Sequence, residues 1–212
     1  MRDEYHHQTQ RRRLLEQIRE RGIRDDRVLR AMYAIPRHLF LDSTFEQHAY
    51  EDKPFSIGAG QTISQPYTVA RQTELLQVEK RHHVLEIGTG SGYQACVLAQ
   101  LGARVFTVER QRELYQRTKI LLPRLGFPQI RTYYRDGSMG LPELAPFHRI
   151  LVTAGATEVP PALPEQLKIG GILVIPVGES SQRMLRITRR EDGFTTEDFG
   201  AFAFVPFLGG RE

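Results

Sequence analysis

The sequence of 212 residues fits one ordinary domain, since chains of about 100 to 200 residues usually fold around a single core. Hydrophobic residues make up 40% and charged residues 25%, a balance that excludes an intrinsically disordered chain. No stretch approaches the roughly 20 consecutive apolar residues of a membrane span, and the polar N-terminus has no hydrophobic signal core. We therefore expect a cytoplasmic protein without a membrane partner.

The formal net charge of +4 does not indicate a nucleic-acid partner, because the charges are dispersed along the chain. The one tight basic cluster, Arg11–Arg13, is typical of a solvated helix face. The seven histidines show no metal-ligand spacing and are expected at the surface or at helix ends. The single cysteine, Cys96, is expected to be a small buried hydrophobe. We therefore expect no metal and no nucleic acid, and we expect a monomer.

The N-terminal part is predicted to be helical. Apolar residues recur at helical spacing over 14–18, and a second helix is predicted from Asp25, a suitable N-cap, to Pro36. Residues 53–65 have no clear period and are predicted to form a long loop, which in a compact domain is often functional. Pro66 then suits the first position of a further helix.

From residue 84 onward, short apolar strands alternate with helices. The strands begin about 20 to 25 residues apart, which is the spacing of βα units, and their Val, Ile and Leu content is typical of a parallel sheet covered on both faces. Two further strands, 184–188 and 202–207, flank the turn 191–193 and are expected to be antiparallel at the sheet edge. The parallel strands are predicted at 84–87, 105–108, 130–134, 150–152 and 172–175.

These elements predict an α/β fold with a doubly wound, mostly parallel sheet. We interpret residues 1–212 as one domain, in which 1–80 form the helical N-terminal part with the functional loop and 81–212 form a Rossmann-like core.

The most informative segment is Val84–Tyr93, a strand that runs into a glycine-rich turn and then a helix. Such glycines let the backbone approach a ligand closely and expose amides at a helix N-terminus, in the crevice where doubly wound sheets bind nucleotides. A dinucleotide fingerprint would need glycine at position 93, and the phosphate-loop and hydrolase-elbow motifs are also not matched. The residues expected to face the ligand are Gly88, Thr89, Gly90, Ser91 and Gly92.

Three acidic residues accompany this turn. Glu109 ends the next predicted strand, where a carboxylate can accept hydrogen bonds from both ribose hydroxyls or simply cap the following helix. Asp136, before Gly137, can accept a bond from an exocyclic amine such as that of adenine, or form a plain Asp-Gly turn. Glu86 would lie beneath the crevice, facing a cationic ligand, an arginine or backbone amides. Together these groups fit S-adenosylmethionine better than NAD, because no pyrophosphate receptor is required.

The sequence resembles, in several separated blocks over its whole length, the protein-L-isoaspartate O-methyltransferase family, most closely its bacterial form. The discriminating block is Thr62-Ile63-Ser64-Gln65-Pro66, since the glycine turn is shared by many methyltransferases. Val108-Glu109-Arg110 and Phe204-Val205-Pro206 are further blocks, and Arg135 departs from the glycine that relatives commonly have there. The resemblance implies the Rossmann-like fold of class I S-adenosylmethionine-dependent methyltransferases.

The resemblance also implies a protein-repair reaction. A methyl group passes from S-adenosylmethionine to the free α-carboxyl of an L-isoaspartyl residue in a damaged protein, and the ester collapses to a succinimide that partly restores aspartate. A carboxylate is already a nucleophile at neutral pH, so the site must chiefly align the reactants and exclude water.

The resemblance assigns roles to residues of this sequence. Ser64 is expected to orient the substrate carboxylate, although on its position alone it would be an N-cap ahead of Pro66. The cofactor is expected to bind Thr62, Ile63, Gln65, Glu86, Gly88, Thr89, Gly90, Ser91, Gly92, Glu109, Arg110, Asp136 and Gly137, and the substrate Ile63, Ser64, Val205 and Pro206.

Three other functions compete with this one. A methyltransferase of the same fold acting on RNA or a small molecule would need a basic stripe or a stacking platform, which the sequence does not show. An NAD-dependent oxidoreductase is disfavoured by Tyr93. A non-catalytic binding module is disfavoured by the set of Ser64, Glu109 and Asp136.

Overall fold

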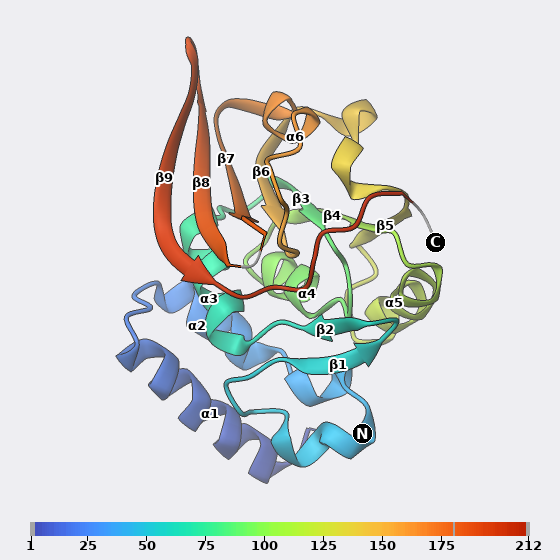
Figure 1. Ribbon diagram of the computed structural model, residues 1–212. Helices are drawn as coiled ribbons and strands as arrows, with labels where there is room; N and C mark the ends of the chain where they lie inside the picture. Colours follow the sequence, from blue (N-terminus) through green and yellow to red (C-terminus); the bar gives the residue numbers. More distant parts are fainter. Residues whose placement is uncertain (1–2, 180, 211–212) are drawn as a thin grey trace.

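The structure, a computed structural model that describes residues 3–179 and 181–210, is built on a seven-stranded sheet (Figure 1). The strand order is β5-β4-β3-β6-β7-β8-β9. The first five strands in this order pair parallel with one another, whereas β8 pairs antiparallel with both β7 and β9. The prediction of a doubly wound, mostly parallel sheet with antiparallel edge strands is confirmed. The strands are β3 (His83–Ile87), β4 (Arg104–Glu109), β5 (Arg131–Tyr134), β6 (Phe147–Val152), β7 (Leu167–Val177), β8 (Gln182–Arg190) and β9 (Gly193–Phe202).

Alternating side chains of the central strands belong to two apolar clusters, one on each face of the sheet. Val84 packs with residues of the five long helices, whereas Leu85, its neighbour in β3, packs with residues of the short helices. The long helices are α1 (Tyr5–Glu20), α2 (Asp26–Ala34), α3 (Pro66–Leu76), α4 (Tyr93–Gln100) and α5 (Arg112–Arg124). The short ones on the second face are η3 (Gly137–Met139), η4 (Pro142–Leu144) and α6 (Ala162–Glu165).

The predicted helix boundaries of the N-terminal part are confirmed. The Asp25 carboxylate accepts a hydrogen bond from the Arg27 amide at 2.8 Å and so caps α2, and Pro66 is the first residue of α3. Two short 3₁₀ helices, η1 (Arg37–Phe40) and η2 (Ser43–His48), lead from α2 to the predicted loop. Among the described residues, no helix combines the length and the apolar character that crossing a bilayer would require.

The predicted loop 53–65 contains a two-stranded antiparallel hairpin, β1 (Phe55–Gly58) and β2 (Gln61–Ile63). Its turn is made by Gly58, Ala59 and Gly60, which all have positive φ angles, and such turns favour glycine. The hairpin was not predicted because its strands are too short to show an alternating pattern. Ser64 follows directly after β2, so the hairpin fixes where that residue lies.

The last predicted strand was placed wrongly. The second antiparallel strand, β9, begins directly after the turn at residue 193 and ends at Phe202, whereas the prediction placed it at 202–207. Most of β9 is exposed at the sheet edge and its middle, Thr195–Asp198, is polar, so it lacks the apolar alternation that identifies a strand. Residues after Phe202 leave β9 and cross the carboxyl ends of the parallel strands, where Val205 O accepts from Gly155 N at 2.8 Å and Phe207 N donates to Gly155 O at 2.8 Å.

The basic cluster Arg11–Arg13 is solvated only in part. Arg12 and Arg13 are exposed, whereas Arg11 is buried, because its guanidinium donates to the Asp3 carboxylate at 2.9 Å and to the Tyr50 hydroxyl at 3.0 Å. His7 and His38 are buried and their rings stack with centroids 3.9 Å apart; they lie at helix ends, one of the two places expected for histidines, His7 in the first turn of α1 and His38 in η1. Cys96 is fully buried, as predicted.

Candidate active site

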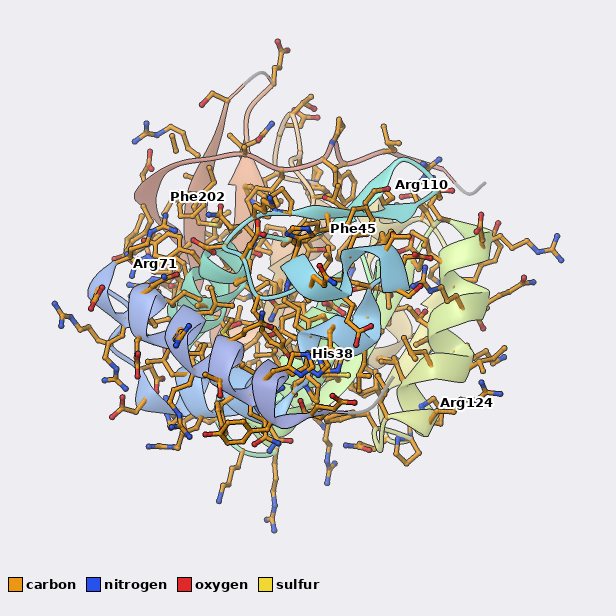
Figure 2. The ribbon with its side chains drawn as sticks, turned by 90° about the horizontal axis from the view of Figure 1, so that it is seen from below. His38, Phe45, Arg71, Arg110, Arg124 and Phe202 are labelled. Atoms are coloured by element: carbon orange, nitrogen blue, oxygen red, sulfur yellow. The ribbon has the colours of Figure 1, made fainter. Side chains whose placement is uncertain are left out.

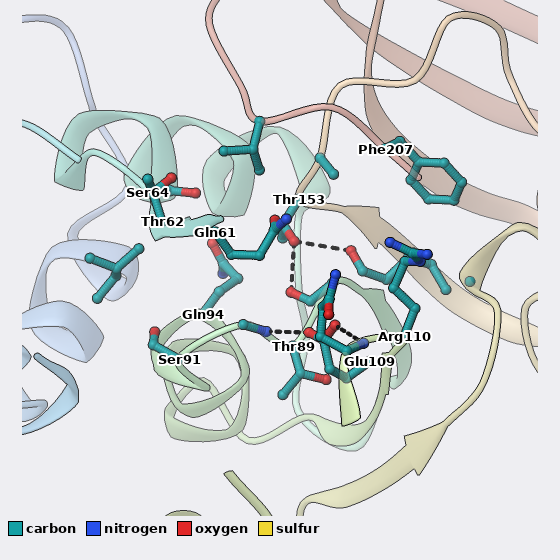
Figure 3. A pocket seen from close by; sticks show the side chains of 18 of the residues that line it. Gln61, Thr62, Ser64, Thr89, Ser91, Gln94, Glu109, Arg110, Thr153 and Phe207 are labelled. Atoms are coloured by element: carbon teal, nitrogen blue, oxygen red, sulfur yellow. Dashed lines mark hydrogen bonds between the residues drawn. The ribbon is translucent and has the colours of Figure 1, made fainter. Parts of the chain in front are cut away.

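A pocket of about 810 Å³, counted with its open mouth, lies at the carboxyl ends of the central parallel strands (Figure 3). Ligands of open α/β sheets bind at this edge. Four segments line most of the pocket: residues 61–64 after the hairpin turn, the glycine turn 87–91, residues 108–111 at the end of β4, and residues 205–208 after β9.

Most of the predicted site residues meet in this pocket, although they come from segments far apart in the sequence. Figure 3 shows Ser64 and Thr62 on one side of it and Glu109 and Arg110 on the other. The predicted residues that line the pocket are Thr62, Ile63, Ser64, Gly88, Thr89, Gly90, Ser91, Glu109, Arg110, Gly137, Val205 and Pro206.

The glycine turn is held rigidly between three strands. Gly88 N donates to Val108 O at 2.9 Å, and the Thr153 hydroxyl donates to Gly88 O at 2.7 Å. Gly88 has a φ of 97°, and a Cβ there would lie 2.4 Å from Thr153 Oγ1. The position therefore requires glycine, because both the backbone angle and the close approach of Thr153 exclude a side chain.

Glu109 is buried at the end of β4, with 5% of its surface exposed. One carboxylate oxygen accepts from Gly90 N at 2.8 Å and the other from Gln111 N at 2.8 Å. Each oxygen keeps capacity for a further hydrogen bond. The carboxylate thus orders the glycine turn and still presents acceptors to a ligand in the pocket.

Glu86 lies beneath the pocket and does not line it. It is fully buried, and its Oε2 accepts from the Thr107 hydroxyl at 2.5 Å, which in turn lies 2.7 Å from the Thr89 hydroxyl at the pocket wall. Its Oε1 has no partner among the described residues. Burial is the main cause that raises the pKa of Glu86 to about 8; the Thr107 hydrogen bond opposes this rise, and the nearby Glu109 adds to it.

This raised pKa has a measurable effect on stability. Between the ordinary pKa of 4.5 and about 8, the folded protein keeps a proton that the unfolded chain releases, so stability falls as pH rises through this window. The Glu86→Gln side chain stays neutral at every pH. Between pH 6 and pH 8 the free energy of unfolding of this variant should therefore fall less than that of the parent, by on the order of 2 kcal/mol. Urea unfolding of parent and variant at both pH values measures the difference. Equal losses in the two proteins would show that Glu86 is ionised in the fold.

Asp136 also lies outside the pocket lining, where it holds the C-terminal segment. Its carboxylate accepts from Ser138 N at 2.9 Å and from Gly210 N at 2.7 Å, and Arg110 Nε donates to Gly210 O at 3.0 Å. Although burial alone would raise it, the pKa of Asp136 is below its ordinary value because these amides donate to the carboxylate. Arg135, which stands where relatives commonly have glycine, pairs with Glu143 at 2.7 Å. Its side chain is therefore directed away from the Asp136 carboxylate.

Gln65 and Gly92 are the other two predicted residues outside the lining. The Gln65 amide nitrogen donates to the backbone carbonyl and to the carboxylate of Asp52, both at 3.0 Å. Gly92 is the N-cap of α4, where a Cβ would lie 2.8 Å from Leu122 Cδ2. In this structure both residues hold the backbone of the site in place and do not face the pocket.

Ser64 lines the pocket, and among the described residues its hydroxyl has no hydrogen-bond partner. The N-cap of α3 is Gln65, so the alternative in which Ser64 caps this helix is wrong. The hydroxyl is available to a molecule that enters the pocket.

Sequence reasoning missed several lining residues. Gln61 precedes Thr62 in β2, Thr153 follows β6, and Gln94 lies in the first turn of α4 with its buried Oε1 lacking a partner among the described residues. The position of Thr153 at the carboxyl end of a central strand was a usable signal. Phe207 was predicted to lie in a strand at 202–207, so its position in the pocket lining was missed.

One group of side chains among the described residues has the spacing of metal ligands: Asp3, His7 and His38, remote from the pocket. The Arg11 guanidinium donates to both oxygens of Asp3, at 3.2 and 2.9 Å. This positive charge disfavours a cation at the same carboxylate.

The sheet order, the glycine turn and the acid at the end of β4 together define a class I methyltransferase. A family model described as protein-L-isoaspartate(D-aspartate) O-methyltransferase matches residues 9–212. The protein-L-isoaspartate O-methyltransferase of Christiangramia forsetii is 55% identical over 98% of both chains, and that of Paracoccus denitrificans is 50% identical over 93% of both. The chain therefore belongs to the protein-L-isoaspartate O-methyltransferase family, and its activity is the O-methylation of isoaspartyl residues in proteins.

Solved structures agree with this assignment. A protein-L-isoaspartate O-methyltransferase superposes with a TM-score of 0.86 at 30% identity, covering 94% of this chain and 66% of the other. A Plasmodium falciparum structure from the same family, in complex with S-adenosyl-L-homocysteine, gives a TM-score of 0.80 at 26% identity over 92% of this chain and 96% of that one.

Proposed function

We propose that the chain methylates the free α-carboxyl of L-isoaspartyl residues in damaged proteins, with Ser64 orienting that carboxylate. The observation that carries this proposal is the Ser64 hydroxyl in the pocket wall, which has no hydrogen-bond partner within residues 3–179 and 181–210 and lies across from Glu109 and the glycine turn. A hydroxyl can donate one hydrogen bond to a carboxylate oxygen and leave the other oxygen free to react. Ile63, Val205 and Pro206 would form the apolar walls around the reacting groups and exclude water.

S-adenosylmethionine supplies the methyl group when it is bound, and the pocket suits it. The Gln94 Oε1, which has no partner among the described residues, the Glu109 carboxylate and the backbone of the glycine turn form a polar cradle in the pocket. We assign the ribose hydroxyls to Glu109, the remaining turn contacts to Gly88, Thr89, Gly90 and Ser91, and further cofactor contacts to Thr62, Ile63 and Arg110, while Gln65 and Gly92 support the backbone of the site. Glu86 supports the turn from below through Thr107 and Thr89.

Asp136 and Gly137 are proposed to bind the adenine ring. Gly137 lies in the pocket wall, and a Cβ there would lie 2.3 Å from a methyl group of Ile87, so the backbone has to approach closely. Asp136 lies behind it, and each of its oxygens keeps capacity for one more hydrogen bond beside the Ser138 and Gly210 amides.

The physical state of the enzyme is also part of the proposal. We infer that residues 1–212 act as one methyltransferase domain, a monomer in the cytoplasm that binds damaged proteins and no nucleic acid. The buried cluster that joins Leu14 and Ile18 of α1 to Val84 of β3 supports a single folding unit. Light scattering after size-exclusion chromatography should give a mass near 24.3 kDa.

The proposed substrate is tested by three acceptors presented in parallel: an isoaspartyl peptide, the aspartyl peptide of the same sequence, and bulk RNA. Isoaspartate has one extra backbone carbon and a shorter carboxylate arm, so the aspartyl carboxylate is displaced when the backbone is held. A displacement of about 1 Å can cost on the order of a hundredfold in rate. We expect tritium from labelled S-adenosylmethionine in the isoaspartyl peptide, with labelling of the aspartyl peptide and RNA near background. Equal labelling of the two peptides, or labelling of RNA alone, would contradict the proposal.

A further inference from the structure

A second depression, which we call the flank groove, lies where the end of β9 meets the start of α3. Figure 1 shows these elements next to each other, and Figure 2 shows Phe202 and Arg71 on this side of the molecule. The lining residues that matter here are Arg21, Gln65, Tyr67, Phe199, Phe202 and Ala203.

The walls of the flank groove are aromatic. The rings of Tyr67 and Phe202 are nearly parallel, with an angle of 7° between their planes and centroids 6.5 Å apart. The Arg21 guanidinium lies 3.8 Å from the centroid of the Tyr67 ring, and Arg186 lies 5.0 Å from that of Phe199. Such planar walls favour a planar side chain, because aromatic pairs gain about 0.5 to 1.5 kcal/mol beyond the area that they bury.

The cations around the groove are neutralised by neighbouring acids. Arg21 pairs with Asp52, and Arg186 makes a bidentate pair with Glu197 at 2.7 to 2.9 Å. Arg71, over the Phe199 ring, pairs with Glu74 at 2.9 Å. The groove therefore offers stacking surface and no uncompensated charge, which favours an uncharged aromatic group over an anion.

Two chain segments run from the groove to the active-site pocket. Gln65 in the groove follows Ser64 in the pocket, and Ala203 in the groove lies two residues before Val205 in the pocket. Consecutive Cα atoms are 3.8 Å apart and an extended chain advances about 3.3 to 3.6 Å per residue. A peptide whose isoaspartyl residue reaches Ser64 would thus place a residue about one to three positions away at the groove.

We propose that the flank groove is a substrate subsite that binds an aromatic side chain of the damaged protein, close in sequence to the isoaspartyl residue. This inference rests on the proposed orientation of the isoaspartyl carboxylate by Ser64. It predicts that the enzyme prefers damaged sites with Phe, Tyr or Trp at one flanking position.

The test is a set of isoaspartyl peptides with alanine at every flanking position, into which phenylalanine is placed one position at a time. For the parent enzyme we expect phenylalanine at one position to lower KM about tenfold relative to the all-alanine peptide, with little change in kcat. In the Phe202→Ala variant this KM ratio should fall to within twofold of one. The ratio is taken within each variant, so a general loss of stability does not imitate the effect.

The matched control is Phe194→Ala, which removes an exposed phenylalanine from the opposite end of β9, where Arg189 lies over its ring. This variant should keep the tenfold ratio. An equal loss in both variants, an unchanged ratio in Phe202→Ala, or no preference at any position in the parent would each overturn the proposal.

Calorimetry with the same peptides measures binding without methylation, so it tests the subsite independently of the proposed function. If the parent methylates no peptide, the proposed function fails. Tighter binding of one phenylalanine peptide by the parent than by Phe202→Ala would then still support the subsite, and equal binding would refute it.

Discussion

Replacing Ser64 by alanine is expected to lower kcat for isoaspartyl peptide by about a hundredfold, because a carboxylate without its orienting hydroxyl is displaced from the line of attack. The affinity for S-adenosyl-L-homocysteine should stay within about twofold, since the hydroxyl is proposed to hold the other reactant. Initial rates at saturating peptide measure the first quantity, and calorimetry measures the second.

The control for this variant is Ser56→Ala, which removes an exposed hydroxyl from β1 of the same hairpin. It should leave both quantities unchanged. Because Gln65 and not Ser64 is the N-cap of α3, Ser64→Ala should also lack the loss of about 1 kcal/mol in stability that removal of a helix cap causes. Full activity of Ser64→Ala would reclassify Ser64 as a structural residue.

Replacing Glu109 by alanine is expected to weaken S-adenosyl-L-homocysteine binding by about 1.5 to 3 kcal/mol, the usual value of hydrogen bonds to a charged group. Part of this loss in affinity comes from a less ordered glycine turn, because Glu109 also accepts a hydrogen bond from the Gly90 amide. Titration calorimetry on the folded variant gives the affinity, and its thermal unfolding shows how much of the loss is structural.

Glu113→Ala is the matched control, since Glu113 is an exposed acid in the first turn of α5, four residues further along. It should bind S-adenosyl-L-homocysteine as the parent does. An unchanged affinity in Glu109→Ala would remove Glu109 from the cofactor site, and tighter binding of NAD than of S-adenosyl-L-homocysteine by the parent would argue against the cofactor itself.

The parts of the fold that could be predicted from the sequence are those where buried strands and glycine positions leave few choices. Val84 to Ile87 is continuously apolar apart from Glu86, and it runs into a turn whose first residue, Gly88, no other residue could replace. Glu109 could be predicted in the same way, because it directly follows the apolar run of residues 105–108 in β4. These local signals identified the pocket edge and most of its wall.

The parts that were missed depend on pairing between segments or on polar edge strands. The hairpin of β1 and β2 is held by its turn and not by a hydrophobic period. The strand β9 is polar, so the apolar residues after it were mistaken for the strand. Likewise, no sequence pattern shows that Asp136 reaches Gly210 or that the Gln65 side chain turns toward Asp52.

The route of residues 203–210 across the strand ends also bears on how the pocket wall is secured. The wall at 205–208 lies outside the strands of the sheet, and it is attached by hydrogen bonds to Gly155 and by the tie between Gly210 and Asp136. Loss of the Asp136 carboxylate should therefore loosen this wall as well as remove an acceptor from the proposed adenine site, so that one residue serves both the architecture and the chemistry of the pocket.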